Sequence, residues 1–247
     1  GLVFCAAVPG VRAANTPPDP SLMLHYTFDE AHGDVAKDLS SHGHDGKIVK
    51  AQYLEEFNGR RGVLRFDGKQ SILHCPDSDS LDFAFDTDMS FEMQVRFNSL
   101  AGDSRGMIFG DLNNFGLHVN YWNTLILNYS RFNTELSTHE SMGIPVKRHV
   151  MSDQWSHIAV VVEYPRIRFY KNGELFHDAY MPVSGARKRF SIPKRIGGWD
   201  DRCAPIDLDE FRLYRRALSA AEVAAHAKGK EVPPGKAHEL TVEPYWY

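Results

Sequence analysis

Four aspartates in this sequence could coordinate a hard metal ion. Calcium takes about six to eight oxygen ligands from carboxylates and main-chain carbonyls, and it accepts irregular loops. The residues that offer such oxygens are Asp29, Asp38, Asp45 and Asp209. A second interpretation stays open, in which Asp38 and Asp45 are turn residues with exposed side chains and Asp209 accepts bonds from backbone amides. A calcium ion held here would be structural rather than catalytic.

Aromatic, amide and acidic side chains in two short segments could bind a sugar. Sugar sites use flat aromatic rings to cover the apolar faces of pyranose rings, and amides or acids to bond the hydroxyl groups. One segment holds Asn120, Tyr121 and Trp122, and the other holds Trp199 and Asp200. The alternative is that both tryptophans seal the edge of a hydrophobic core, as large aromatic residues often do.

Catalytic motifs are harder to find. Retaining glycosidases need two carboxyl groups about 5.5 Å apart. The nearest arrangement is Asp207 and Asp209, close to the C-terminus, whereas the central strand expected over residues 91–97 has one acid, Glu92. The sequence has no G-x-S-x-G, phosphate-loop or dinucleotide-binding motif, and its histidines lack the paired spacing of a zinc site. We therefore predict that the protein is not an enzyme.

The C-terminal acids belong to a segment with strand periodicity. Residues 206–214 alternate with period two, which is typical of a β-strand. This alternation predicts that Asp209 shares a face with Phe211 and Leu213, and a carboxylate on an apolar face is costly unless something pairs with it. Ser219 and Glu222 then form the S-x-x-E capping box of a short helix.

Turn signals separate short apolar or alternating runs along the rest of the chain. Residue pairs of this kind are Asn58-Gly59, Asp67-Gly68, Asn113-Asn114, Asn172-Gly173 and Gly197-Gly198. Their spacing is typical of a sandwich of many antiparallel strands. Apart from the helix that follows Ser219, we expect little helical structure.

Composition excludes several classes of protein. The chain has 247 residues, of which 43% are hydrophobic, and this is enough for one large all-β domain. Its net charge of −4 argues against nucleic-acid binding, which needs a basic face. Its apolar runs are shorter than the roughly 20 residues of a membrane-spanning helix.

The N-terminus suggests an extracytoplasmic location. Residues 1–14 are rich in apolar and small side chains and end near a small-x-small pattern, so we interpret them as the remnant of a signal peptide. Residues 15–21 are a proline-rich linker, residues 22–228 are the folded domain, and residues 229–247 are a C-terminal tail. The expected location is secreted, periplasmic or at the cell surface.

Two cysteines remain if Cys5 leaves with the signal peptide. Cys75 and Cys203 are an even pair in an oxidising compartment, so a disulfide is plausible. Two buried free thiols are the alternative, and the sequence leaves both open.

Blocks of sequence in a fixed order resemble the laminin G-like, concanavalin A-like jelly-roll domains that are common in secreted bacterial proteins. These blocks are residues 24–30, 38–46, 64–68, 89–92, 154–162, 169–175 and 206–223. The resemblance covers about residues 22–228 and implies an antiparallel β-sandwich with one short C-terminal helix. It also implies neighbouring first and last strands, which would bring Asp29 and Asp209 together at a calcium ion.

The resemblance implies a secreted, non-catalytic module that binds carbohydrate, extracellular matrix or cell-surface glycans. Two departures from the family pattern are Gln94, where a Trp is usual, and Ile206, where a Gly is frequent. One alternative function is a structural or adhesive spacer in a larger surface protein, with its other domains as partners. A polysaccharide-degrading enzyme on the same fold is the other.

Overall fold

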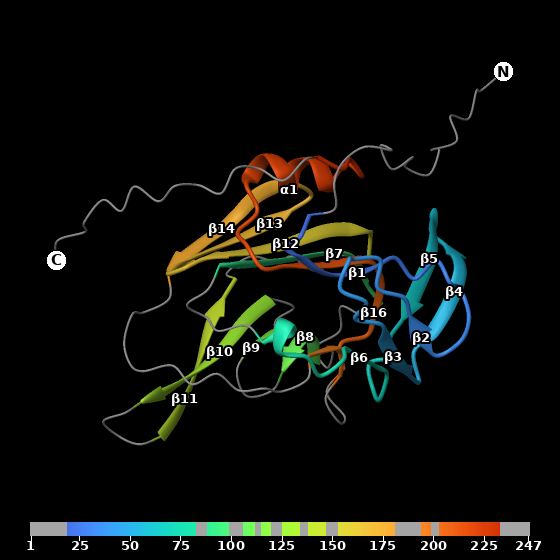
Figure 1. Cartoon of the computed structure of the whole chain (residues 1–247), viewed down its shortest axis with the longest axis horizontal. Coiled ribbons are helices and arrows are strands. Elements are labelled where there is room, and N and C mark those ends of the chain that lie inside the picture. Colours follow the sequence, from blue (N-terminus) through green and yellow to red (C-terminus); the bar gives the residue numbers. More distant parts are fainter. Residues whose placement is uncertain are drawn as a thin grey trace.

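The computed structural model confirms the predicted β-sandwich (Figure 1). Two antiparallel sheets lie one over the other, and a short helix lies on the outer face of one of them. The structure describes residues 19–82, 88–98, 106–111, 115–119, 125–133, 138–146, 153–180, 194–198 and 203–232. The predicted signal remnant, most of the linker and most of the tail lie outside these ranges.

The sheet beneath the helix is called sheet A. Its strands, in spatial order, are β14 (Glu174–Tyr180), β13 (Arg166–Lys171), β12 (Ser156–Glu163), β7 (Met89–Phe97), β16 (Ile206–Tyr214), β5 (Arg60–Arg65) and β4 (Gln52–Phe57). The first strand, β1 (Leu22–Tyr26), also pairs with β16, and Tyr26 lies opposite Phe211. The first and last strands are therefore neighbours, as the resemblance implied.

The opposite layer is called sheet B. Its order is β11 (Thr138–Pro145), β10 (Leu125–Asn133), β9 (Phe115–Val119), β8 (Gly106–Asp111), β15 (Arg195–Gly197), β6 (Ile72–His74), β3 (Gly46–Val49) and β2 (Val35–Ala36). A 3-10 turn, η1 (Asp79–Leu81), follows β6. The predicted turn at Asn172-Gly173 joins β13 to β14, and both of its residues have the positive φ that such two-residue hairpins need.

The hydrophobic core lies between the two sheets. Every second residue of β7 enters it, from Met89 through Phe91 and Met93 to Phe97, because successive side chains of a strand point to opposite faces. Phe109 of sheet B packs against Phe211 of sheet A with ring centroids 4.8 Å apart. The other residues of β7, including Ser90 and Glu92, therefore face outward from sheet A.

Helix α1 (Ala220–His226) covers part of that outer face (Figure 1). The predicted capping box begins it, since the Ser219 side chain accepts the Glu222 amide and Glu222 accepts the Ser219 amide. Val223 belongs to a second apolar cluster with Val161 and Tyr170 of sheet A. Within the described ranges, no helix is long and apolar enough to span a membrane.

Strand β16 contains a bulge that corrects one prediction. Its pairing with β7 shifts between Asp209 and Arg212, and Glu210 has a φ of 53°. A bulge inserts one extra residue and reverses the alternation beyond it. Leu208 and Phe211 both lie in the core, so Asp209 faces outward. The expectation that Asp209 shares a face with Phe211 and Leu213 is wrong for this reason.

Candidate functional site

The outer face of β16 carries two buried carboxylates. Asp207 is fully enclosed and accepts two bonds from the Arg65 guanidinium, with Nε–Oδ1 and Nη2–Oδ2 distances of 2.7 and 2.9 Å. Arg96 Nη1 lies 3.2 Å from Oδ2, and Asn98 donates to Oδ1 at 2.9 Å. Such a satisfied, charge-assisted set makes Asp207 a structural residue that ties β5, β7 and β16 together.

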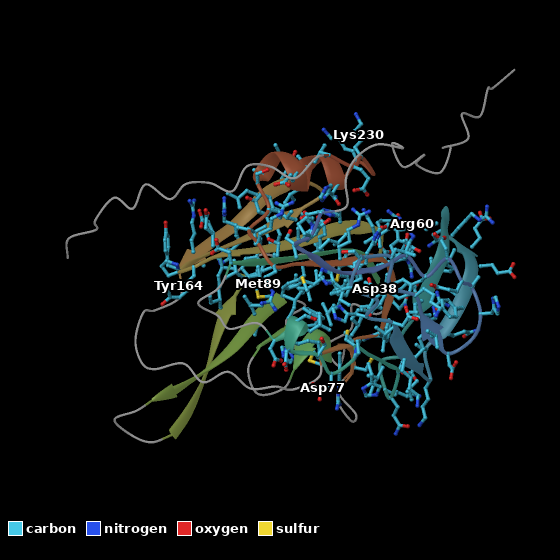
Figure 2. The ribbon with its side chains drawn as sticks, in the orientation of Figure 1. Asp38, Arg60, Asp77, Met89, Tyr164 and Lys230 are labelled. Atoms are coloured by element: carbon cyan, nitrogen blue, oxygen red, sulfur yellow. The ribbon has the colours of Figure 1, made fainter. Side chains whose placement is uncertain are left out.

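Asp209 forms an ion pair with Arg60, the first residue of β5. Arg60 lies on the side of the molecule opposite Tyr164 (Figure 2), and its guanidinium also stacks over the Trp155 ring at 5.4 Å. Burial raises the pKa of Asp209 to about 7, the Arg60 charge opposes this rise, and the negative charges of Glu210 and Asp29 add to it. Asp209 therefore titrates near neutral pH.

Asp29 lies near enough to Asp209 for its charge to act on that carboxylate. The chain after β1 passes closely over β5. Gly62 makes this contact possible: it has a φ of +65°, and a Cβ there would lie 2.7 Å from Asp29 Oδ1 and 2.9 Å from the Asp29 Cα. Only glycine fits such a place without displacement of the neighbouring backbone.

Asp38 organises the loop between β2 and β3. Its Oδ1 accepts the backbone amides of His25 and Ser40, each at 2.9 Å. Its Oδ2 accepts the Ser40 hydroxyl at 2.6 Å and the His44 amide at 2.8 Å. The side chain is fully enclosed, so Asp38 is a turn acid, although not an exposed one.

Asp45 lies in the same loop and is exposed. It accepts the Asp38 amide at 2.9 Å and pairs with Lys37 Nζ at 2.6 Å, and the Lys37 bond lowers its pKa. The oxygens of Asp38, Asp45 and Asp209 that such a site would use are thus engaged by N–H and O–H donors or by cations. Within the described ranges, no three His, Cys, Asp or Glu side chains converge as a metal site. In this arrangement a calcium ion would have to displace those partners, and the ion stays a prediction.

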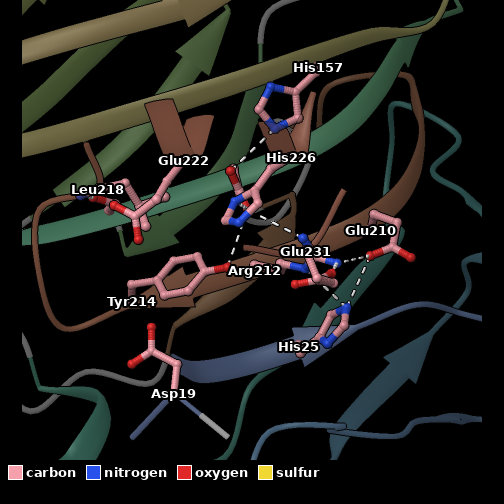
Figure 3. A network of polar contacts seen from close by, with 12 residues as sticks. Asp19, His25, His157, Glu210, Arg212, Tyr214, Leu218, Glu222, His226 and Glu231 are labelled. Carbon is pink, nitrogen blue, oxygen red and sulfur yellow. Dashed lines mark hydrogen bonds and ion pairs between the residues drawn. The ribbon is translucent and has the colours of Figure 1, made fainter. Parts of the chain in front are cut away.

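A second polar cluster lies between sheet A and helix α1 (Figure 3). Its centre is Glu92 of β7, whose Oε1 lies 2.8 Å from Nδ1 of His226 on α1. Glu92 Oε2 lies 3.3 Å from Nε2 of His157 on β12, and the Tyr214 hydroxyl donates to Oε1 at 3.3 Å. Arg212 Nη1 is 3.6 Å from Oε1. We call these five residues the Glu92 cluster.

The Glu92 cluster continues to the edge of the helix through Arg212. Arg212 Nε donates to His25 Nε2 at 3.1 Å. His25 Nε2 also lies 3.0 Å from Glu210 Oε2. Arg212 Nη2 bonds Glu210 at 3.1 Å and Glu231 at 2.6 Å. Strands β1, β7, β12 and β16 and the chain after α1 are therefore linked by one set of charges.

The electrostatics of the cluster favour an ionised Glu92. Burial alone would raise its pKa, but the close His157 and His226 rings and the Arg212 charge hold the pKa well below its usual range. The sequence alone gives little sign of this cluster. Its only signal was one acid at an outward position of a central strand.

This geometry bears on catalysis. The two carboxyl groups of a glycosidase must flank the glycosidic bond of a bound sugar. The one acid of β7, Glu92, has a side chain only 2% exposed and lies under a helix. It can fasten the helix, but in this arrangement no glycosidic bond can reach it.

The residues predicted to bind a ligand lie outside the described ranges. They are Asn120, Tyr121, Trp122, Trp199 and Asp200. The strands that lead to them are described. β9 and β15 are both antiparallel to β8, so they run in the same direction on either side of it. Val119 at the end of β9 lies opposite Gly106, whereas β15 ends one residue after the Ile196–Phe109 pair, so the two ends are also offset along the strands.

The two cysteines considered for a disulfide are buried free thiols. Cys75 and Cys203 are each nearly inaccessible and form no disulfide. Burial raises the pKa of each to about 12, so neither is a reactive thiolate at neutral pH. Of the two alternatives left open by the sequence, the structure has the free thiols.

Comparison with known proteins identifies the family. The family model described as the concanavalin A-like lectin/glucanases superfamily, of laminin G type, matches residues 67–224. This is more than half of the chain, and the chain therefore belongs to that superfamily. A comparison with curated proteins found no match.

Solved structures agree on the fold. The binding domain of Paraclostridial Mosquitocidal Protein 1 superposes with a TM-score of 0.67 at 16% identity, covering 85% of this chain and 52% of that chain. The botulinum neurotoxin serotype D binding domain superposes with a TM-score of 0.63 at 11% identity, covering 85% of this chain and 51% of that chain. A third structure is of botulinum neurotoxin type C, whose cell entry depends on interaction with two ganglioside molecules. Its TM-score is 0.63 at 11% identity, and the match covers 86% of this chain and 52% of that chain. This chain spans about half the length of these neighbours.

Proposed function

We propose that this chain is a non-catalytic module of a secreted or surface protein and that it binds glycans. The observation that carries the proposal is the enclosure of Glu92. The family contains both lectins and glucanases, and the one acid of β7 is sealed beneath α1 rather than offered to a substrate. Binding without catalysis is the function of the family that this arrangement supports best.

The strands that precede the aromatic segments support the same proposal. β9 and β15 run in the same direction on either side of β8, and Trp122 and Trp199 follow their last residues by three and two positions in the sequence. Two aromatic rings that approach one ligand from neighbouring loops are a common way to hold a sugar. The solved neighbours are binding domains of toxins, and this favours recognition over hydrolysis.

A glycan array with the full chain tests the proposal, followed by titration of the best ligand. We expect Trp122→Ala to lower the affinity about tenfold or more, as loss of a stacked aromatic ring should, with an unchanged melting temperature. Tyr180→Ala is the matched control, because Tyr180 is an exposed aromatic residue on β14 of the other sheet. A folded chain that binds no glycan would leave the spacer function, and cleavage of an array ligand would indicate an enzyme.

Calcium forms a separate part of the proposal. A calcium ion between Asp29 and Asp209 would have to displace the Arg60 guanidinium from its ion pair with Asp209. Melting curves in millimolar calcium and in chelator test this. A calcium-dependent rise in the melting temperature that Asp209→Asn abolishes would establish the ion, whereas identical curves would refute calcium binding.

Export is tested by locating the chain in the medium, the periplasm or the cytoplasm of cells that produce it.

A further inference from the structure

Helix α1 is attached to sheet A in large part through ionisable side chains (Figure 3). Its buried residues are Glu222, Val223 and His226, so two of these three can change charge. Apolar contact comes from Val223 and from Leu218, just before the helix, within the second apolar cluster. The strands are held instead by the large core between the sheets. The attachment of α1 therefore depends on charge more than the pairing of the two sheets does.

Arg212 brings one positive charge to this attachment and is shared among three carboxylates. Its Nη2 donates to Glu210 at 3.1 Å and to Glu231 at 2.6 Å. Its Nη1 lies 3.6 Å from Glu92 Oε1, which is beyond hydrogen-bond distance. Glu92 is the most enclosed of the three acids, yet it receives the weakest contact from the guanidinium.

Two histidines lie where they can supply the missing charge. His226 Nδ1 is 2.8 Å from Glu92 Oε1, and His157 Nε2 is 3.3 Å from Oε2. Neither contact is a well-aligned hydrogen bond, since both ring nitrogens are buried without a hydrogen-bond partner. Attraction between opposite charges needs no such alignment, whereas the hydrogen bond of a neutral imidazole does. Protonated rings therefore hold Glu92 more strongly than neutral rings do.

Other ionisable side chains around α1 are paired or stay neutral. Glu222 accepts the Arg216 guanidinium at 2.7 Å, and Asp19 accepts the same group at 2.8 Å. Burial, and then the Glu92 charge, raise the pKa of the Tyr214 hydroxyl well above its usual range. The ionisable residues that complete the surroundings are His25 of β1, Glu210 of β16, Tyr170 and Lys171 of β13, Glu174 of β14, and Lys228, Lys230 and Glu231 after the helix.

We propose that the Glu92 cluster is a pH-sensitive latch that holds α1 against sheet A at mildly acidic pH and loosens as the pH rises. Histidine is the side chain whose charge ordinarily changes between about pH 5 and pH 8. Protonation of His157 and His226 adds two positive charges beside one cation and three carboxylates, and this balances the group. Loss of these protons leaves Glu92 enclosed with Arg212 at 3.6 Å as its cation, a costly state for a buried charge.

Opening of the latch uncovers the outer faces of β7 and β12 and leaves the core between the sheets in place. The inference goes beyond glycan binding and does not depend on it. It concerns a movement of one helix, so the measurement must follow that helix separately from the strands.

Hydrogen exchange of the full chain, followed by mass spectrometry and corrected for the intrinsic exchange rate at each pH, makes this separation. We expect the amides of residues 223–228 to lose protection about tenfold or more between pH 5.5 and pH 8.5, as loss of a charge-assisted contact should. The amides of β7 and β12 should keep theirs. This comparison uses the wild-type chain, so it stands even where a variant detaches the helix.

Variants assign the effect to the histidines. His226→Gln should give the low protection of α1 already at pH 5.5 and should abolish the pH dependence. His157→Gln, a change on β12 rather than on the helix, should reduce the pH dependence. His32→Gln is the matched control, because His32 is an exposed histidine that contacts the Glu30 carbonyl, and it should behave as wild type.

Three results would overturn the inference. One is equal or higher protection of α1 at pH 8.5 than at pH 5.5 in the wild type. Another is a pH dependence that His226→Gln retains. The third is a loss of protection in β7 and β12 by the same factor as in α1, because the whole domain would then open rather than the helix.

Discussion

Glu92 Oε1 of β7 and His226 Nδ1 of α1 lie 2.8 Å apart in a site almost closed to solvent. This contact joins the last helix of the domain to a central strand of sheet A. Around it, Ser90 of the same strand accepts the Leu218 amide at 2.9 Å and donates to the Arg216 carbonyl at the same distance. The outer face of β7 is thus used to hold α1.

The Glu92 cluster should contribute strongly to stability. Removing one partner of a buried ion pair leaves an uncompensated polar group and costs about 3–5 kcal/mol. We therefore expect Glu92→Gln to lower the free energy of unfolding by about 3 kcal/mol in urea titrations followed by fluorescence. Glu174→Gln, an exposed change on β14 of the same sheet, should stay within about 0.5 kcal/mol of wild type.

A double-mutant cycle with His226→Gln shows whether the effect belongs to this contact. The two single changes should not add, because each removes the same pair. Additive losses, or a loss for Glu92→Gln no larger than for Glu174→Gln, would mean that the helix is held by its apolar side chains alone.

Close approach of the chain at Gly62 leads to a second prediction. An alanine there needs a left-handed backbone, which costs about 1–2 kcal/mol, and its Cβ also collides with the Asp29 backbone. Gly62→Ala should therefore lower the free energy of unfolding by more than about 2 kcal/mol. Gly59→Ala is a matched control, since Gly59 also has a positive φ but nothing lies within 4 Å of its Cβ position. Equal losses for the two variants would contradict a close contact between Asp29 and β5.

Much of the fold could be predicted because its signals are local. The Asn172-Gly173 turn and the Ser219–Glu222 capping box depend on residues a few positions apart. The neighbouring positions of β1 and β16 came from the family resemblance instead. No local pattern in a single sequence states which distant strands pair.

The parts that could not be predicted depend on tertiary pairing. The bulge at Glu210 arises from the register between β16 and β7, and it reversed the side on which Asp209 was expected. The hydrogen bonds that occupy Asp38 come from loop residues and from His25 of β1, so a composition suited to calcium was not evidence of an open site. The Glu92 cluster needs a helix folded back over the sheet, which no spacing along β7 reveals.

Asp209 should lower the free energy of unfolding as the pH rises, the opposite of what a carboxylate with a lowered pKa would do. Its pKa is about 7 in the folded protein, because burial opposes its charge more than Arg60 favours it, whereas the ordinary value is 3.8. The folded state therefore holds this proton more tightly than the unfolded state does. Its contribution to stability is fully present below about pH 4 and is lost as the pH rises through 7.

The difference in unfolding free energy between wild type and Asp209→Asn isolates this effect, because an amide does not titrate. Relative to the variant, wild type should lose on the order of a few kcal/mol between pH 4 and pH 8. Urea titrations at intervals across that range measure it, and other titrating groups cancel in the comparison. Parallel curves would mean that Arg60 keeps Asp209 ionised throughout. In that case the ion pair would outweigh burial.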